Sequence, residues 1–186
     1  MMNKKQAILQ TALEAFVEYG FHGTPITKLI ASAGVSNGTF FHYFKTKEEL
    51  IASIYVATKE ELYEFIVPDT AEIVSVKKGI RELWYKWIQW GSEHEQKFKF
   101  LELFASSPFI HRLHKEEMKR QFAFIEQLLN RGIQEEVIVP MKLTLLSEHI
   151  YGSIRGMIMY QQKYGKLSED EMQHMFHLLW RSIVQF

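Results

Sequence analysis

The placement of helix-breaking residues constrains this chain more than any other feature of its sequence. It has only ten glycines and four prolines in 186 residues, which is below ordinary globular usage. Pro25, Pro68, Pro108 and Pro140 each fall between segments in which apolar residues recur every three or four positions. Because a proline inside a helix costs about 3 kcal/mol, we expect helices between the prolines and breaks at them.

The apolar periodicity supports a wholly helical chain. In the first segment the apolar face runs from Ile8 through Leu13 to Val17 and stops at Gly20, a residue type that commonly ends helices. No alternating strand pattern, internal repeat or low-complexity tract competes with it. The sequence therefore predicts an all-α protein of about nine helices. The expected ranges are 3–19, 25–32, 36–42, 47–66, 75–90, 93–105, 110–135, 141–163 and 169–185.

Three of these helix starts carry a capping-box pattern. In a capping box, a hydroxyl accepts a hydrogen bond from a backbone N–H of the first turn, and a glutamate three residues later bonds the N–H of the cap residue. The pattern satisfies backbone groups that a helix terminus otherwise leaves without partners. The three pairs are Thr46 with Glu49, Ser92 with Glu95, and Ser168 with Glu171.

Composition excludes several classes of protein. The hydrophobic fraction is 47% and the charged fraction 24%, which argues for a folded chain rather than a disordered one. The chain has no cysteine, so disulfides, cysteine-ligated metals and thiol catalysis are excluded. No apolar run is long enough to span a membrane, and no signal-peptide core follows the first residues. A cytoplasmic protein is the expectation.

The stretch from residue 24 to residue 47 carries the clearest functional signal. Thr24 is predicted to cap a short helix with Pro25 at its first position. Gly34 is expected to end that helix in the left-handed conformation, and Ser36 to cap the next one. Residues 1–47 also hold five lysines but only two glutamates. Two short helices joined by a tight turn in a basic segment indicate a helix-turn-helix, whose second helix enters the DNA major groove.

The second helix of this motif offers small polar groups. Asn37, Thr39 and His42 suit base edges, and Gly38 permits close backbone approach. Lys47 is expected to bind a phosphate together with the N–H groups that begin the following helix. Phe40 and Phe44 are predicted core residues, as in any helical corner. The residues predicted to face DNA are Thr24, Thr27, Lys28, Ser36, Asn37, Gly38, Thr39, Phe41, His42, Tyr43 and Lys47.

The same residues resemble a known family. The resemblance rests on Ala33-Gly34-Val35-Ser36, then Gly38-Thr39-Phe40-Phe41-His42-Tyr43-Phe44, then Lys45-Thr46-Lys47-Glu48-Glu49-Leu50. The stretch from Ile8 to Phe21 also looks like the first helix of the same family. Together they resemble the tetracycline-repressor-like (TetR) family of bacterial transcription regulators over about the first 50 residues. Two positions depart from its usual pattern. Phe41 replaces a tyrosine whose hydroxyl typically contacts phosphate, and Ile30 replaces a frequent alanine.

The resemblance implies a ligand-responsive DNA-binding regulator, most often a repressor, acting as an all-helical homodimer. Residues 1–46 would form the DNA-binding domain and residues 47–186 a ligand-binding and dimerisation domain. The partners would be double-stranded operator DNA, a second copy of the chain and a small-molecule effector. Effector binding would change the spacing of the two recognition helices and release DNA. No cofactor, metal, membrane contact or enzymatic activity is expected.

The remainder of the chain suggests where an effector and a second subunit would bind. Aromatic residues are dense between residues 75 and 125, which favours a cavity for a lipophilic or aromatic effector, or simply a well-filled core. The candidate pocket residues are Tyr55, Trp84, Trp87, Phe104, Phe122, Tyr151 and Arg155. The candidate dimer residues, on the last two long helices, are Gly152, Gly156, Met157, Tyr160, Met172, Met175, Phe176, Leu179, Trp180 and Ile183.

Two other functions compete with that of a DNA-binding regulator. A helical enzyme or metal carrier would rely on the aromatic body and on the histidine pairs His111 with His114 and His174 with His177. Glu171 and His174 have the spacing found in di-iron bundles, but such a site needs a second copy of that motif and further carboxylates. The other alternative is a regulator that has lost DNA binding, for which Phe41 is the only hint.

Overall fold

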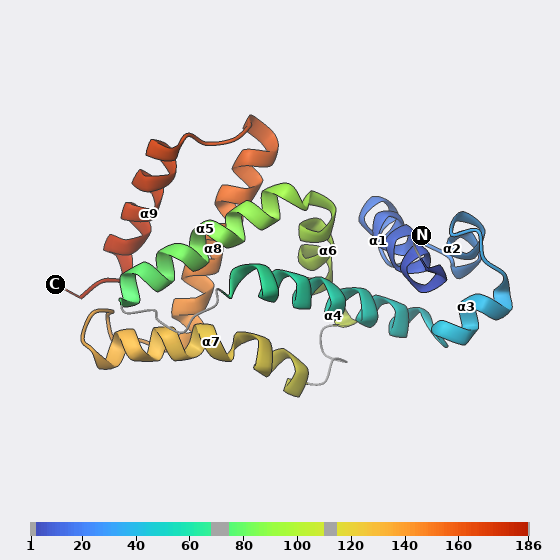
Figure 1. Cartoon of the computed structure of the whole chain (residues 1–186), viewed down its shortest axis with the longest axis horizontal. Helices are drawn as coiled ribbons and strands as arrows, with labels where there is room; N and C mark the ends of the chain where they lie inside the picture. The colour runs from blue at the N-terminus through green and yellow to red at the C-terminus, as the bar shows by residue number, and fades with distance from the viewer. Residues whose placement is uncertain (1–2, 68–74, 110–114, 186) are drawn as a thin grey trace. The chain divides into compact units, whose positions relative to one another are not determined.

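The computed structural model describes residues 3–67, 75–109 and 115–185, with only the backbone described from 115 to 122. Over these ranges the chain forms nine α-helices and no strand beyond one isolated bridge (Figure 1). The all-α prediction is confirmed. The predicted residues 110–114 of the seventh helix lie outside the described ranges. The helices are α1 (Lys4–Tyr19), α2 (Ile26–Ser32), α3 (Asn37–Tyr43), α4 (Lys47–Ile66), α5 (Val76–Glu93), α6 (Glu95–Ala105), α7 (Lys115–Gln134), α8 (Leu143–Tyr164) and α9 (Glu169–Ile183).

The predicted capping boxes have three different outcomes. Ser168 and Glu171 form both bonds at the start of α9. At α4, the Glu49 N–H donates to the Thr46 hydroxyl at 3.1 Å, but the Glu49 carboxylate accepts from the N–H of Lys45 instead. The prediction for Ser92 is wrong, because α5 continues through residue 93 and the next helix begins after His94 without a side-chain cap.

Packing contacts divide the chain into two compact units. The first unit comprises residues 1–61 and 94–115, and the second comprises residues 62–93 and 116–186. This grouping places most of α4 and all of α6 with the N-terminal helices, whereas the predicted functional boundary falls after residue 46.

The first unit is held together by aromatic contacts between α1 and α6. Phe16 lies 5.2 Å from Phe21, and Phe21 lies 5.7 Å from Phe100, measured between ring centroids. All three side chains are buried. Such edge-to-face pairs contribute about 0.5–1.5 kcal/mol beyond the area that they bury. The first helix of the DNA-binding motif is therefore fixed by residues far along the chain.

The second unit is built around α5, which packs against both α8 and α9 (Figure 1). The contact with α8 is close, because a Cβ on Gly91 would lie 2.4 Å from Cδ1 of Ile158. The indole N–H of Trp84, on α5, donates to the Ser153 hydroxyl of α8 at 3.0 Å. This bond satisfies the one polar atom of a fully buried ring. Within the described residues, no helix is both long enough and apolar enough to cross a membrane.

Candidate nucleic-acid interface

The turn between α2 and α3 has the geometry that the sequence predicts. Gly34 has φ +63°, a left-handed conformation that glycine adopts without a steric penalty. Its N–H donates to the carbonyl of Ala31 at 3.2 Å, and the N–H of Val35 donates to the carbonyl of Ile30 at 3.3 Å. This pair of bonds is a Schellman motif, which closes the end of α2. The direction of α3 is therefore set by backbone bonds.

The cap and the inner face of α3 fix how the helix is held. The Ser36 hydroxyl accepts from the N–H of Thr39 at 3.1 Å, which confirms Ser36 as the cap. Phe40 and Phe44 are buried, as predicted, with their ring centroids 6.1 Å apart. These two rings anchor a helix of only seven residues. The rest of α3 is consequently left available to a partner.

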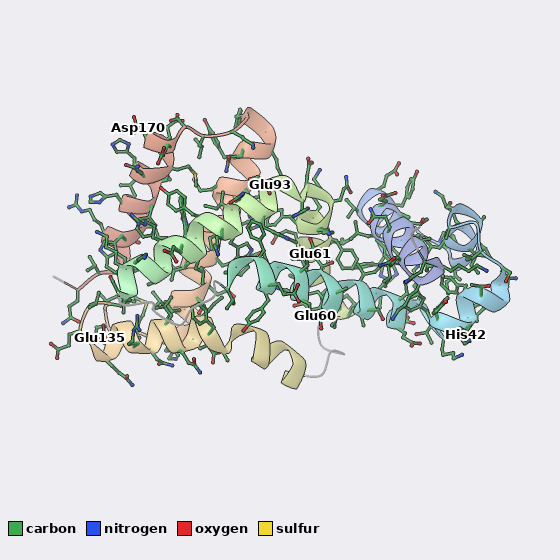
Figure 2. The ribbon with its side chains drawn as sticks, viewed as in Figure 1. His42, Glu60, Glu61, Glu93, Glu135 and Asp170 are labelled. Atoms are coloured by element: carbon green, nitrogen blue, oxygen red, sulfur yellow. The ribbon has the colours of Figure 1, made fainter. Side chains whose placement is uncertain are left out.

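The outward face of α3 gathers the residues predicted to read bases. Asn37, Gly38, Phe41 and His42 are exposed, and their spacing puts them on one side of the helix. His42 is marked in Figure 2. A Cβ on Gly38 would meet only the Ser36 hydroxyl, at 3.9 Å, so the chain itself does not require glycine there. A partner that approaches the backbone closely would require it.

Three lysines lie within the helix-turn-helix or directly after it. The Lys28 ammonium lies 3.6 Å from the centroid of the Tyr19 ring, and the Lys45 ammonium donates to the carbonyl of Phe41 at 2.8 Å. Lys47 is half-buried, with its ammonium 5.9 Å from the centroid of the Phe16 ring. Burial lowers the pKa of Lys47, and the nearby Glu48 carboxylate opposes that effect. Lys45 was not among the residues predicted to face DNA, and it is exposed directly after α3.

Thr24 has neither of its two predicted roles. Its side chain is buried, and its hydroxyl donates to the carbonyls of Gly20 at 2.8 Å and Ala15 at 3.2 Å. It therefore ties the loop after α1 to that helix, and it neither caps α2 nor faces DNA. Pro25 occupies the cap position of α2, without a side-chain bond. Thr27 is exposed, and Thr39 and Tyr43 are half-buried.

Four of the aromatic residues predicted to contact an effector form two separate pairs. Tyr55 and Phe104 stack with their centroids 4.1 Å apart, and Trp87 lies 5.4 Å from Tyr151. Burial raises the pKa of Tyr55 to about 12. Arg155 is exposed on α8, and the side chain of Phe122 lies outside the described part of the chain. The role of these residues in effector binding stays a prediction.

The predicted dimer residues separate into two groups. Four of them are buried within their own subunit, so the prediction is wrong for these: Phe176, Leu179, Trp180 and Ile183. Phe176 shows the reason, because its ring packs 5.8 Å from that of Trp84 on α5. The remaining six are exposed or half-buried: Gly152, Gly156, Met157, Tyr160, Met172 and Met175. A Cβ on Gly152 or Gly156 would meet nothing within 4 Å.

Several exposed apolar residues escaped the sequence reasoning. Leu145 is 61% exposed and Leu178 is 60% exposed, and Met159 is exposed as well. Leu145 and Met159 fall in register with Gly152 and Gly156 along one side of α8. That helical spacing was present in the sequence, but apolar side chains on a helix are more often core. Only the structure separates the inner stripe of α8 from the outer one.

Known proteins resemble this chain both in sequence and in structure. Residues 8–54 match the family described as "Bacterial regulatory proteins, tetR family". The Fatty acid metabolism regulator protein of Bacillus subtilis is 26% identical over 168 residues, which cover 87% of each chain. The regulator RutR of Escherichia coli K12 is 35% identical over 85 residues, which cover 42% of this chain and 38% of RutR.

The structural similarity extends over the whole fold. A crystal structure from Shewanella sp. PV-4, provisionally assigned as a TetR-family transcription regulator, aligns with a TM-score of 0.85 and 26% identity, covering 99% of this chain and 100% of that one. The rival interpretation of a helical enzyme or carrier without DNA binding is not favoured by these relatives. The helix-turn-helix geometry and the sequence match identify residues 8–54 as a DNA-binding region of the TetR family of bacterial transcriptional regulators, and the full chain has the fold of TetR-family regulators.

Proposed function

We propose that this chain is a repressor that binds a pseudo-palindromic operator as a homodimer and is released by a lipophilic effector. The observation that carries the proposal is the outward face of α3, where Asn37, Gly38, Phe41 and His42 are all exposed. A dimer would place two such helices in major grooves about one helical turn apart, roughly 34–36 Å.

Within this proposal, the residues divide by the part of DNA that they touch. Asn37, Thr39 and His42 contact base edges, and Phe41 contacts a thymine methyl group, since its phenyl ring cannot donate to phosphate. Gly38 allows the backbone of α3 to approach DNA. The phosphate contacts fall to residues at the margins of the motif. These are Thr27, Lys28, Ser36, Tyr43 and Lys47.

In this proposal, DNA reading and effector binding are separated at the boundary predicted from the sequence. Residues 1–46 read DNA, and residues 47–186 bind the effector and the second subunit. The proposal includes no catalytic step and no cofactor, and it has the protein act in the cytoplasm. Packing between α1 and α6 supports a link between the two tasks, because a shift of α6 moves a helix of the DNA-reading part.

The effector class rests on composition and on one relative. The body of the chain is rich in buried aromatic rings, including Trp84, Trp87 and Phe104, which would suit an apolar ligand. The Bacillus subtilis relative, similar over most of its length, is named a fatty acid metabolism regulator. We therefore place this chain in the control of fatty acid metabolism, with a fatty acid or an acyl derivative of one as the effector.

Release of a preformed complex tests this effector class. Protein bound to labelled operator DNA would be titrated with fatty acids of 8 to 18 carbons, with the matching fatty alcohols as controls. We expect release that strengthens with chain length, because each buried CH₂ contributes about 0.8 kcal/mol. DNA that stays bound at every chain length would contradict a fatty-acid effector, while leaving operator binding intact.

The exposed side of α8 is the proposed dimer surface. Gly152 and Gly156 leave room for a partner helix, and Leu145, Met159 and Tyr160 supply exposed apolar area beside them. Replacing Gly152 with glutamate should convert a dimer to a monomer in sedimentation analysis. Asn130→Glu, which adds the same charge at an exposed position of α7 outside this surface, is the matched control and should leave the dimer intact. A Gly152→Glu protein that remains dimeric would place the interface elsewhere.

A further inference from the structure

A cavity of about 520 Å³ opens on the second unit, between the first turns of α5 and the middle of α9. Its volume falls within the range of small-molecule sites, roughly 300–1,000 Å³. Neither the helix-turn-helix nor the rings predicted to hold an effector contribute to it. The lining residues are Ser75, Lys77, Lys78, Arg81, Tyr85, Gln173, Phe176 and His177.

Aromatic rings line the apolar part of this cavity. The ring centroids of Tyr85 and Phe176 are 6.3 Å apart. Phe176 in turn stacks with Trp180, with centroids 6.4 Å apart and ring planes inclined by 26°. Phe176 and Trp180 are buried and Tyr85 is half-buried, so the rings are held in place by the core of the second unit. A flat apolar group would find a preformed surface here.

Positive charge is concentrated at the edge of the same cavity. Lys77, Lys78 and Arg81 are exposed on α5, and His177 is exposed on α9. Lys78 lies 3.7 Å from the Glu82 carboxylate. Within the described ranges, no carboxylate forms an ion pair with Lys77 or Arg81. The Lys77 ammonium lies 5.5 Å from the centroid of the Trp180 ring. Two cations of this edge are therefore available to a ligand.

The spacing of these cations does not serve the helix itself. Lys77 and Arg81 are four residues apart, where like charges destabilise a helix by a few tenths of a kcal/mol. Positive charge near the first turn of a helix is also unfavourable to the helix dipole. Tyr85 lies one turn beyond Arg81. Burial raises the pKa of the Tyr85 phenol, the Arg81 charge opposes this shift, and the Glu169 carboxylate adds to it. An anion bound among these groups would relieve the repulsion.

We propose that the α5–α9 cavity binds a small organic anion, with a flat apolar group on Phe176 and Tyr85 and a phosphate or carboxylate group at Lys77 and Arg81. Arginine suits such a group because its planar guanidinium binds two oxygens at once. Lys77 adds a second positive charge, and the Gln173 amide and the Ser75 hydroxyl provide neutral hydrogen-bonding groups at the same cavity.

The site is compatible with a second subunit on the far side of α9. Gln173, Phe176 and His177 face the cavity. His174, Leu178 and Arg181 are exposed on a different side of the helix. The proposed site therefore remains accessible in a dimer formed through α8 and that side of α9. It does not depend on operator binding, so its test can fail without affecting the proposed function.

Calorimetric titration of the full chain tests the proposal with three probes that share a naphthalene ring and differ in the attached group. The probes are 1-naphthyl phosphate, 1-naphthoate and the neutral 1-naphthalenemethanol. We expect the anions to bind at least tenfold more tightly than the neutral compound, and the difference between the two anions identifies the preferred acid group. The double variant Lys77→Gln/Arg81→Gln should bind the better anion at least tenfold more weakly. The control Lys142→Gln/Lys166→Gln removes two exposed lysines of the same unit, and it should bind as the native protein does.

Acetylation of lysines gives a second measurement that needs no variant. The bound anion should protect Lys77 from an acetylating reagent while leaving Lys142 reactive. Equal binding of all three probes, unchanged binding by the double variant, or a Lys77 that stays unprotected would overturn the proposal. So would the absence of measurable binding of either anion at millimolar concentration.

Discussion

Helices α3 and α5 use their side chains in opposite ways. In α5, nine of 18 residues are buried, and the helix packs against α8 and α9. In α3, only Phe40 of seven residues is fully buried. Neither packing nor capping explains why Asn37, Gly38 or His42 occupies its position. The identity of the buried residues of α5 is thus explained inside the chain, whereas the identity of the exposed residues of α3 points to a partner outside it.

Two glycines make this contrast specific. A Cβ on Gly91, in α5, would lie 2.4 Å from Ile158, so packing between helices requires glycine there. A Cβ on Gly38, in α3, would touch nothing closer than 3.9 Å. Packing therefore requires glycine at position 91 but not at position 38, where we propose that glycine serves DNA recognition. Substitutions in α5 should change stability, whereas substitutions in α3 should change DNA binding.

The largest expected effect comes from Trp84→Ala. The change empties a fully buried site and leaves the Ser153 hydroxyl without its donor. Truncations of this kind lower the free energy of unfolding by about 3–5 kcal/mol. Urea denaturation would measure the loss, and Trp84→Phe, which keeps most of the volume, should cost less. A loss below about 1 kcal/mol would show that α5 and α8 are not the packed centre of the second unit.

Lys59 differs from the other packed side chains because it carries a positive charge. Burial lowers the pKa of Lys59 to about 8, although the Glu102 carboxylate opposes the shift. Between pH 8 and the usual lysine pKa of about 10.4, the unfolded chain binds a proton that the native chain does not. Raising the pH through this window should therefore increase stability, and below pH 8 the cost of burying the charge is fully present.

Lys59→Met tests this sign. The variant should be more stable than the native protein at pH 7, by an amount on the order of 3 kcal/mol, and the difference should shrink as the pH rises toward 10. Comparing the two proteins at each pH isolates Lys59 from every other titrating group. A difference that stayed constant across the window would mean that Lys59 has an ordinary pKa.

Gly38→Ala should separate stability from recognition. Alanine removes the helix penalty of glycine and should raise stability by up to about 1 kcal/mol. The added methyl group would also stand between α3 and DNA, so we expect operator affinity to fall about tenfold or more, equivalent to at least about 1.4 kcal/mol. Thermal unfolding and operator titration measure the two quantities. A variant that gained stability and kept its affinity would remove Gly38 from the interface.

Lys47→Ala should produce the smallest effect. Losing one phosphate contact should weaken binding to all sequences alike and reduce the slope of log affinity against log salt concentration by about 0.9. Titrations at four salt concentrations would give the slope. Relaxed preference at a single base pair would instead assign Lys47 to base reading. Lys142→Ala, at an exposed lysine outside the motif, serves as the control.

The sequence predicted the fold well because helix signals are local. The apolar period, Gly34, Ser36 and the Ser168–Glu171 box act within one or two turns, and the structure confirms each of them. Thr24 and Ser92 have the same hydroxyl-before-helix sequence pattern but do not form the predicted caps. Thr24 instead bonds carbonyls four and nine residues away, and Ser92 lies inside a longer helix. Those outcomes depend on tertiary placement.

The surfaces of the second unit could not be predicted in the same way. Phe176 and Trp180 resembled dimer residues because they are large and apolar, yet α5 covers them. Lys77 and Arg81 lie almost a hundred residues from Gln173 and His177, so no local pattern could bring them to one cavity. Residues that act through non-local contacts become visible only when the helices are assembled.

The claim that α3 reads DNA is tested most directly by fluorescence anisotropy with the duplex just upstream of this chain's own gene. A scrambled duplex of the same composition, and two salt concentrations, complete the measurement. The account predicts a preference for the native duplex of about 10³ or more, which is lost in Asn37→Ala but not in Lys142→Ala. Absence of binding to either duplex at low salt would contradict the account.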